Sequence, residues 1–351
     1  MVYIINALIV ILYGLIVKTF AKKRWKKLFF FLSFLHLFLL HALRNPYVYE
    51  DNDYYAEAYI NIGDFSFIES ITPSIQYPIM GQGYLFYNWL LNHISHDPVF
   101  FFSVTSLIII WGITSFIYKY SYEPIWSTCF FILSPSLLDM SFFVLRQHLA
   151  AIFLLLALSN INRIKASIFF SILAILFHMS AVIFLPFYLF YFTSKWPIGI
   201  RRMVIWLVVI VFLFALGRFY FLQYYDRYTD YTDISRNTLP LLIVGGVFIS
   251  HYLNGTYHIV RIVEIPLLKF LAYSLFILIG LWGTPGAARM SIFFLYPITV
   301  LFPLLFKYNK KEIVYQWKVL FSIGYSIAIF FVWLYVYLTN GFIEYQMRII
   351  N

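Results

Sequence analysis

The chain has 351 residues, of which 62% are hydrophobic, 23% aromatic and only 11% charged. A water-soluble protein cannot bury this much apolar surface, and a mean hydropathy of +0.82 instead indicates a lipid environment, where backbone groups must be satisfied within helices. The net charge of +10 is typical of cytoplasmic loops in a membrane protein, so no nucleic-acid partner is expected. A single cysteine, Cys129, excludes an intrachain disulfide. The composition therefore predicts an all-α, polytopic integral membrane protein.

The first predicted element is an uncleaved membrane span over residues 1–17, followed at once by six basic residues within 18–27. These charges predict that the span runs from outside to inside. A second span, 28–43, returns the chain to the outer face, where a polar first outer loop covers 44–97. Within this loop the apolar segment 83–95 is roughly 20 Å long as a helix, against about 30 Å for a hydrocarbon core. It is predicted to be an interfacial helix.

Further along the chain, the region 166–193 is either one tilted span or two half-helices folded back at 178–180. The folded arrangement keeps 18 of the 25 basic residues inside and leaves twelve of the fifteen acids outside. A single span would move nine basic residues outward, which the positive-inside rule disfavours. The sequence thus predicts one transmembrane domain over 1–351, with about twelve membrane helices including the half-helix pair and a second outer loop at 217–237. The other predicted spans are 98–118, 124–143, 146–161, 203–216, 238–256, 270–281, 290–306 and 319–338.

The predicted topology gathers unusual polar residues at the outer face, and all seven basic residues there are arginines. A guanidinium grips phosphate or carboxylate with two parallel hydrogen bonds, whereas lysine mainly supplies a point charge. An outer pocket for an anionic, lipid-linked substrate needs such groups. The candidate binding and catalytic residues are Arg44, Asp51, Asp53, Tyr54, Glu57, Arg146, Gln147, His178 and Arg289.

Each candidate also has a purely structural interpretation. Arg146 and Asp139 are close enough in sequence to form an ion pair that only joins two helices. His178 could cap a helix end, and Asp51 and Asp53 could be ordinary carboxylates of a solvated loop. The tyrosines of the first outer loop could form an interfacial belt rather than contact sugar.

The other polar residues do not indicate a cofactor site. His36 and His41, on the second span, are predicted to form hydrogen bonds between helices. The sequence contains no phosphate-cradling glycine loop and no serine-hydrolase elbow. We expect neither a metal nor another cofactor.

Four short segments resemble the EpsG-like group of bacterial polysaccharide polymerases, relatives of the Wzy O-antigen polymerases. They occur in the same order and at similar spacing over most of the chain. One departure lies in the interfacial helix, where Gly81-Gln82-Gly83-Tyr84 lacks the acid that often precedes the glycine–aromatic pair. The segments are DNDYY at 51–55, LRQHLA at 145–150, LAILFHMSA at 173–181 and ARM at 288–290.

The resemblance implies a membrane-embedded, GT-C-like glycosyltransferase with its active site on the outer, periplasmic side of the bacterial inner membrane. The donor would be a growing O-antigen or exopolysaccharide on polyprenyl pyrophosphate, and the acceptor one lipid-linked repeat unit. Membrane lipid and a chain-length regulator protein are the further partners it implies.

This chemistry suits the candidate residues. Convergent arginines, here Arg44, Arg146 and Arg289, can stabilise a departing pyrophosphate without a metal. His178 or Asp53 can accept the proton of the attacking sugar hydroxyl. Two alternatives remain open at this point: a single-sugar transferase or ligase that uses a polyprenyl phosphate donor, and a flippase of lipid-linked glycans, which the broken helix would also allow.

Overall fold

The computed structural model describes residues 2–193, apart from 22–23, 44, 46, 48–49, 75, 78–79, 135–136, 139 and 143. It also describes 234–253, 265–280, 285–304 and the single positions 199, 204, 208, 211 and 324. Every regular element in these residues is helical, which confirms the all-α class. The chain divides into two compact units, one from 1–181 and 340–351 and the other from 182–339. The predicted spans 203–216 and 319–338, except for the single positions 204, 208, 211 and 324, fall outside the described residues.

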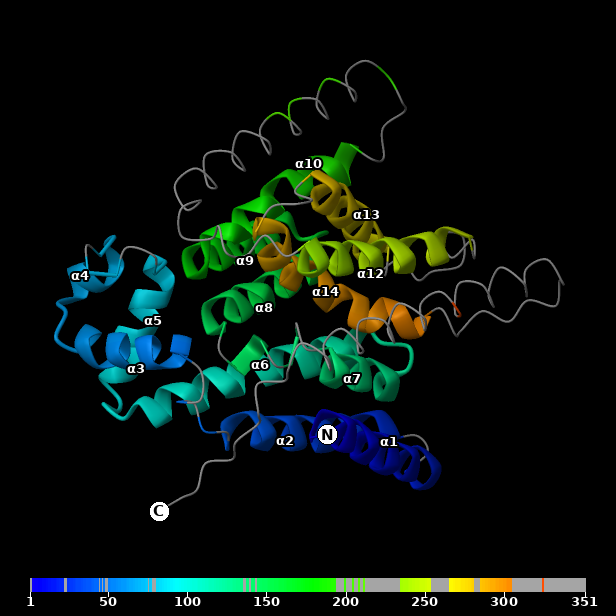
Figure 1. The fold of residues 1–351 in the computed structure, drawn as a ribbon, viewed down its shortest axis with the longest axis horizontal. Coiled ribbons are helices and arrows are strands. Elements are labelled where there is room, and N and C mark those ends of the chain that lie inside the picture. Colours follow the sequence, from blue (N-terminus) through cyan, green and yellow to red (C-terminus); the bar gives the residue numbers. More distant parts are fainter. Residues whose placement is uncertain are drawn as a thin grey trace, which may run out of the picture. The chain divides into compact units, whose positions relative to one another are not determined.

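The first unit is a helical bundle with a small helical cluster at one end (Figure 1). In the bundle, α2 packs along α6, α1 packs on α7 and α2, and α8 packs on α9. The cluster is formed by the three short helices of the first outer loop, at the end of α2 and the start of α6 (Figure 1). The helices are α1 (Val2–Phe20), α2 (Trp25–Ala42), α3 (Glu50–Ile62), α4 (Phe67–Ile71), α5 (Gln82–Asn92), α6 (Pro98–Tyr120), α7 (Pro124–Leu133), α8 (Leu145–Ser159) and α9 (Ile164–Phe177).

Two of the described helices, α2 and α6, contain a stretch long and apolar enough to cross a membrane, and eight further helices contain apolar stretches of 10–17 fully described residues. The start of α6 is fixed by its sequence. Pro98 has no backbone N–H to satisfy, and the Asp97 side chain accepts a hydrogen bond from the Val99 N–H at 2.9 Å. One face of α6 forms the centre of the unit, with Phe101, Ile109 and other apolar side chains fully buried.

The predicted span 124–143 is wrong in its second half. The helix α7 ends at Leu133, and Ser134 is already extended because it precedes Pro135, whose ring disfavours helical backbone at the preceding residue. Between the proline and α8, the regular element among the described residues is a 3-10 turn, η3 (Met140–Phe142). At ten residues, α7 is about 15 Å long and cannot cross the hydrocarbon core alone.

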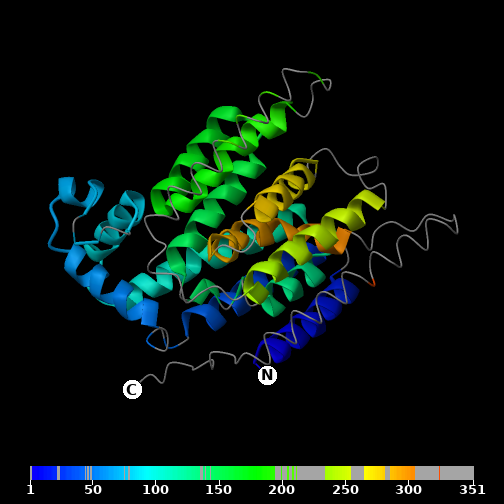
Figure 2. The same cartoon turned by 45° about the horizontal axis from the view of Figure 1, so that its top comes forward.

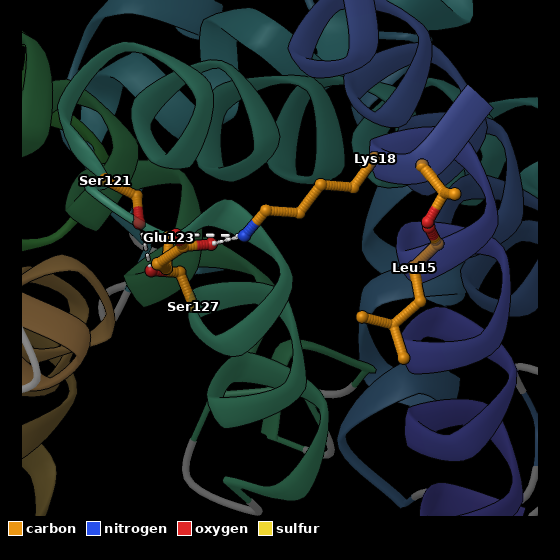
Figure 3. A network of polar contacts seen from close by, with 6 residues as sticks. Leu15, Lys18, Ser121, Glu123 and Ser127 are labelled. Atoms are coloured by element: carbon orange, nitrogen blue, oxygen red, sulfur yellow. Dashed lines mark hydrogen bonds and ion pairs between the residues drawn. The ribbon is translucent and has the colours of Figure 1, made fainter. Parts of the chain in front are cut away.

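An ion pair joins two helix ends that the predicted topology assigns to the inner face. Lys18, in the last turn of α1, lies 3.0 Å from the carboxylate of Glu123, which precedes α7 (Figure 3). Beside it, the hydroxyls of Ser121 and Ser127 are hydrogen-bonded at 2.6 Å (Figure 3). The two helix ends therefore lie at the same level of the bundle.

Histidines of α2 form hydrogen bonds between helices, as predicted. His36 Nε2 lies 2.6 Å from Asn6 Oδ1 of α1. His41 is fully buried, with Nδ1 2.7 Å from the Ser106 hydroxyl of α6 and Nε2 2.9 Å from the Ser141 hydroxyl of η3. The second set of contacts fixes η3, and with it the segment that leads into α8.

The second unit contains α10 (Leu185–Thr193), α12 (Ile234–Leu253), α13 (Ile265–Gly280) and α14 (Pro285–Leu304). The last three helices pack on one another, and α10 packs on α13 (Figure 2). The Tyr273 hydroxyl donates a hydrogen bond to the Ile183 carbonyl just before α10. Of the predicted second outer loop, 217–237, the last four residues belong to α12, and the rest lie outside the described residues.

Candidate functional site

The acidic start of the first outer loop is a helix rather than the solvated loop expected from sequence. In α3, buried residues recur at helical spacing at Asn52, Tyr55, Ala56, Tyr59 and Ile62, and Ala58 is buried as well. Asp51, Asp53 and Glu57 are exposed between them. A helix fixes the direction of each side chain, so these carboxylates are not equivalent.

Arg146 is held between tyrosines from two other helices. It lies in the first turn of α8, and its guanidinium carbon is 5.7 Å from the ring centroid of Tyr55 in α3 and 6.0 Å from that of Tyr84 in α5. Its Nε donates a long hydrogen bond of 3.4 Å to the Tyr55 hydroxyl. The two rings also contact each other edge to face, with centroids 5.8 Å apart. We call Arg146, Tyr55 and Tyr84 the arginine–tyrosine cluster.

The start of α5 lies directly on the end of α9, because glycines leave room for backbone contact. A Cβ atom at Gly81 would overlap the Leu176 carbonyl oxygen and lie 3.1 Å from the Phe177 carbonyl oxygen. A Cβ atom at Gly83 would lie 2.9 Å from the Leu176 Cβ. The Phe177 ring then packs on Tyr84, with centroids 6.4 Å apart. This contact brings the end of α9 to the arginine–tyrosine cluster.

His178 is the residue at which α9 stops. Its backbone is extended, with φ −151° and ψ 116°, and its side chain is half-buried. The Nδ1 atom lies 2.5 Å from the Ser180 hydroxyl and accepts a hydrogen bond from the Ser180 N–H at 3.4 Å. When Nδ1 accepts, a neutral imidazole carries its proton on Nε2, where it is a hydrogen-bond donor. His178 follows Phe177 directly, so it too lies next to the cluster.

A buried polar network supports the helices that carry the cluster. Asn52 of α3 donates a hydrogen bond of 3.0 Å to the Phe142 carbonyl of η3, and His41 holds the neighbouring Ser141. Because η3 immediately precedes α8, the network connects the start of α3 to the start of α8. These are the two helices that supply Tyr55 and Arg146.

The carboxylates of α3 differ in their direction relative to the cluster. With about 100° of rotation per residue, Asp51 lies roughly 40° around the helix from Tyr55, whereas Asp53 and Glu57 each lie roughly 160° away. Asp51 therefore shares the face of α3 that meets Arg146. Tyr54 is half-buried, and burial raises its pKa while the nearby Arg146 opposes that change.

Of the remaining predicted site residues, some lie in the described part of the chain and others do not. Gln147 is buried in α8. Arg289 lies in the first turns of α14, in the second unit. Arg44 and Asp139 lie outside the described residues. Of the predicted site residues, the structure thus places Tyr54 near Arg146. The helical phase of α3 predicts that Asp51 lies on the same side, and His178 follows Phe177, which packs on Tyr84.

The comparison with protein families identifies the chain over nearly its whole length, since the model of the EpsG family matches residues 27–347. The chain belongs to the EpsG family. This confirms the family expected from the sequence, and membership supports a membrane-bound enzyme of polysaccharide-polymerase type. No curated protein and no solved structure matches the chain.

Two tyrosines of this EpsG-family site, Tyr55 and Tyr84, were not among the residues predicted from sequence. Tyrosine is common in this chain, with 30 copies, and an interfacial belt is the ordinary interpretation of tyrosines next to a membrane. The helical spacing of Asn52, Tyr55 and Tyr59 is the signal that would have singled out Tyr55 as buried. For Tyr84, the two glycines before it indicated a close helix contact but not its partner.

Exposed apolar side chains cover the outside of α4 and α5, remote in sequence from the arginine. Trp89 packs against Phe67 and donates a hydrogen bond to the Phe65 carbonyl at 2.8 Å. Since α5 ends only five residues before the apolar helix α6 begins, we expect this surface to lie at the depth where α6 would enter a membrane. It fits the interfacial position predicted for 83–95. The exposed residues are Phe67, Ile68, Ile71, Leu90 and Ile94.

A spin label at Ile68 or Ile94 is therefore expected to lie about 5–10 Å below the headgroup boundary of a bilayer. The wild-type background suits this measurement, because the single cysteine, Cys129, is buried. Ile68→Cys and Ile94→Cys would be labelled in nanodiscs, and depth measured from the accessibility of the label to oxygen and to a water-soluble nickel chelate. Asp64→Cys, at an exposed position between α3 and α4, is the aqueous control. Labels at positions 68 and 94 that behave like the label at 64 would contradict the interfacial placement.

Proposed function

We propose that the protein polymerises oligosaccharide repeat units carried on polyprenyl pyrophosphate, producing O-antigen or exopolysaccharide at the outer face of the bacterial inner membrane. Its fold would then be of the GT-C-like kind. The observation that carries the proposal is the arginine–tyrosine cluster, in which three segments distant in sequence surround one guanidinium.

The electrostatics of the cluster favour an anion. Arg146 lies in the first turn of α8 and Tyr84 in the first turn of α5, where the helix dipole is positive. Neither helix start has a side-chain cap: the capping positions are Gly81 and Val144. A guanidinium at a helix start adds positive charge where the backbone already supplies it, and a phosphate oxygen is a natural ligand for both.

The reaction is a displacement at the anomeric carbon of the donor glycan. A hydroxyl oxygen of the acceptor sugar forms a bond to that carbon, the bond to the pyrophosphate oxygen breaks, and polyprenyl pyrophosphate leaves with the electron pair. Arg146 stabilises the charge that develops on the leaving group, and Arg44 and Arg289 are proposed to join it. Membrane lipid surrounds the prenyl chains, and a chain-length regulator is the proposed protein partner.

His178 and a carboxylate of α3 divide the proton chemistry. With Nδ1 accepting from Ser180, the Nε2–H of His178 donates to the departing pyrophosphate or to a sugar oxygen. The base that takes the proton of the acceptor hydroxyl is then a carboxylate. The helical phase of α3 favours Asp51 over Asp53 for this role, and Tyr54 and Glu57 line the same loop helix as substrate contacts.

Asp51→Asn is expected to lower the polymerisation rate about a hundredfold or more, since a general base contributes about 10²–10⁴ to a rate. Asp53→Asn is expected to lower it less than threefold, because that side chain points away from Arg146. Both carboxylates are exposed, so neither substitution disturbs buried packing. The measurement is the initial rate of polymer formation by each purified variant. The reverse order of effects would assign the base role to Asp53.

The proposal is tested by reconstitution. Purified protein in liposomes is given a lipid-linked repeat unit from the source strain, and the products are separated on a gel with and without a chelator. A ladder of increasing length that survives the chelator supports a metal-independent polymerase. Addition of a single sugar from a polyprenyl phosphate would point to the single-sugar transferase, and movement of the intact lipid-linked unit across the bilayer without bond formation to a flippase.

A further inference from the structure

Tyr84 has a buried hydroxyl group that has the side chain of Asn88 as a polar neighbour on its own helix. The side chain is fully buried, and its oxygen has no hydrogen-bond partner among the described residues. One turn further along α5, Asn88 donates its amide to the Tyr84 backbone carbonyl at 2.8 Å, and its Oδ1 is also buried without a partner. Buried polar groups are normally hydrogen-bonded, so two unsatisfied atoms on one face of one helix indicate a missing ligand.

The neighbours of Tyr84 identify the chemistry of that ligand. Its ring is enclosed by Tyr55, Phe101 and Phe177. The one charged group against it is, among the described contacts, the guanidinium of Arg146. Burial and the neighbouring Tyr55 raise the pKa of Tyr84, while Arg146 and the side chain of Asn88 oppose them, so the hydroxyl keeps its proton and lies within the field of a cation. A protonated hydroxyl beside a guanidinium is suited to bind an anionic oxygen.

We propose that the Tyr84 hydroxyl donates a hydrogen bond to the same diphosphate oxygen atoms that Arg146 binds, so that Tyr84 is a substrate-binding residue. This inference rests on the proposed function, because it takes the anion to be the diphosphate of a prenyl-linked substrate. The half-buried Arg146 meets the ligand first, and the fully buried Tyr84 forms the inner wall of the site.

The same helix offers a matched control in Tyr87, whose hydroxyl group already has a hydrogen-bond partner. Its hydroxyl lies 2.9 Å from the Thr105 hydroxyl of α6. Removing the Tyr87 hydroxyl therefore breaks an existing hydrogen bond. Removing the Tyr84 hydroxyl breaks none in the ligand-free protein and relieves a buried, unsatisfied group.

The experiment compares Tyr84→Phe and Tyr87→Phe in the full-length protein, using farnesyl diphosphate as a binding probe and thermal unfolding without ligand as the test of structure. Tyr84→Phe is expected to unfold at the wild-type temperature or higher and to bind the probe about ten- to a hundredfold more weakly, as expected for loss of a hydrogen bond to a charged group. Tyr87→Phe is expected to unfold at a lower temperature and to bind the probe normally.

Three results would overturn the assignment. Unchanged probe binding by Tyr84→Phe would show that its hydroxyl does not touch the diphosphate, while leaving Arg146 and the polymerase in place. A lower unfolding temperature for Tyr84→Phe in the absence of ligand would show a structural role. Failure of the wild-type protein to bind the probe would remove the diphosphate site itself, and the proposed function with it.

Discussion

Replacing Arg146 by alanine is expected to reduce polymer formation about a hundredfold or more, since removal of one preorganised charge-stabilising group costs about 10²–10³ in rate. Arg146→Lys should recover only part of this loss, because an ammonium group cannot form two parallel hydrogen bonds to a phosphate. The lipid-linked substrate should remain as single repeat units. The measurement is the polymer ladder formed by each purified variant, together with its unfolding temperature.

A matched control is Arg163→Ala, which removes an exposed arginine at the start of α9, on the predicted inner face. It should change neither the length nor the amount of polymer. Polymer of normal length from Arg146→Ala would contradict the assignment of Arg146 to an anion site. A variant that unfolds at a much lower temperature would instead show that Arg146 holds α3, α5 and α8 together.

Gly81→Ala is expected to destabilise the protein by about 1–3 kcal/mol and to abolish polymer formation. The new methyl group would overlap the Leu176 carbonyl oxygen, which is a backbone atom and cannot turn aside. Relief requires α5 to move away from α9, and this movement separates Tyr84 from Phe177 and from His178 beside it. The unfolding temperature in detergent and the polymer ladder are the two measurements.

Gly245→Ala in α12 is the control for the same chemical change. There a Cβ atom would lie 3.4 Å from the Leu275 side chain, which is ordinary contact. Since glycine within a helix costs up to about 1 kcal/mol relative to alanine, this variant should be as stable as the wild type or more so. Equal stability of Gly81→Ala and Gly245→Ala would contradict the close contact between α5 and α9.

The sequence predicted the long apolar elements well, because a run such as 98–118 has one physical explanation and a proline to mark its start. The residues of α6 and α8 lie within two positions of their predicted bounds. Prediction failed where a local signal opposed the overall pattern. Pro135 ended α7 early, although the apolar run continues past it. The acids of α3 indicated a loop, whereas the segment is a helix whose buried face contains tyrosine, alanine and asparagine.

The candidate site was predictable as a list of charged residues but not as an arrangement. Arg146 and His178 stood out because charges and polar groups are rare in apolar segments. Nothing in the sequence indicated that tyrosines of α3 and α5 lie against the arginine. That information lies in contacts between Tyr55, Tyr84 and Arg146, which are more than 20 residues apart in the sequence. The glycines at 81 and 83 indicated close packing but did not identify the helix against which α5 packs.

The backbone contact between α5 and the end of α9 has a mechanical consequence. Where two helices touch through carbonyl oxygens and glycines, no side chain can rearrange to absorb a displacement. The start of α5 and the end of α9 are therefore expected to move together. If α4 and α5 lie in the bilayer surface as predicted, a tilt of these helices is expected to carry Phe177 and His178 with it, and lipid thickness and curvature would then change the geometry around the arginine.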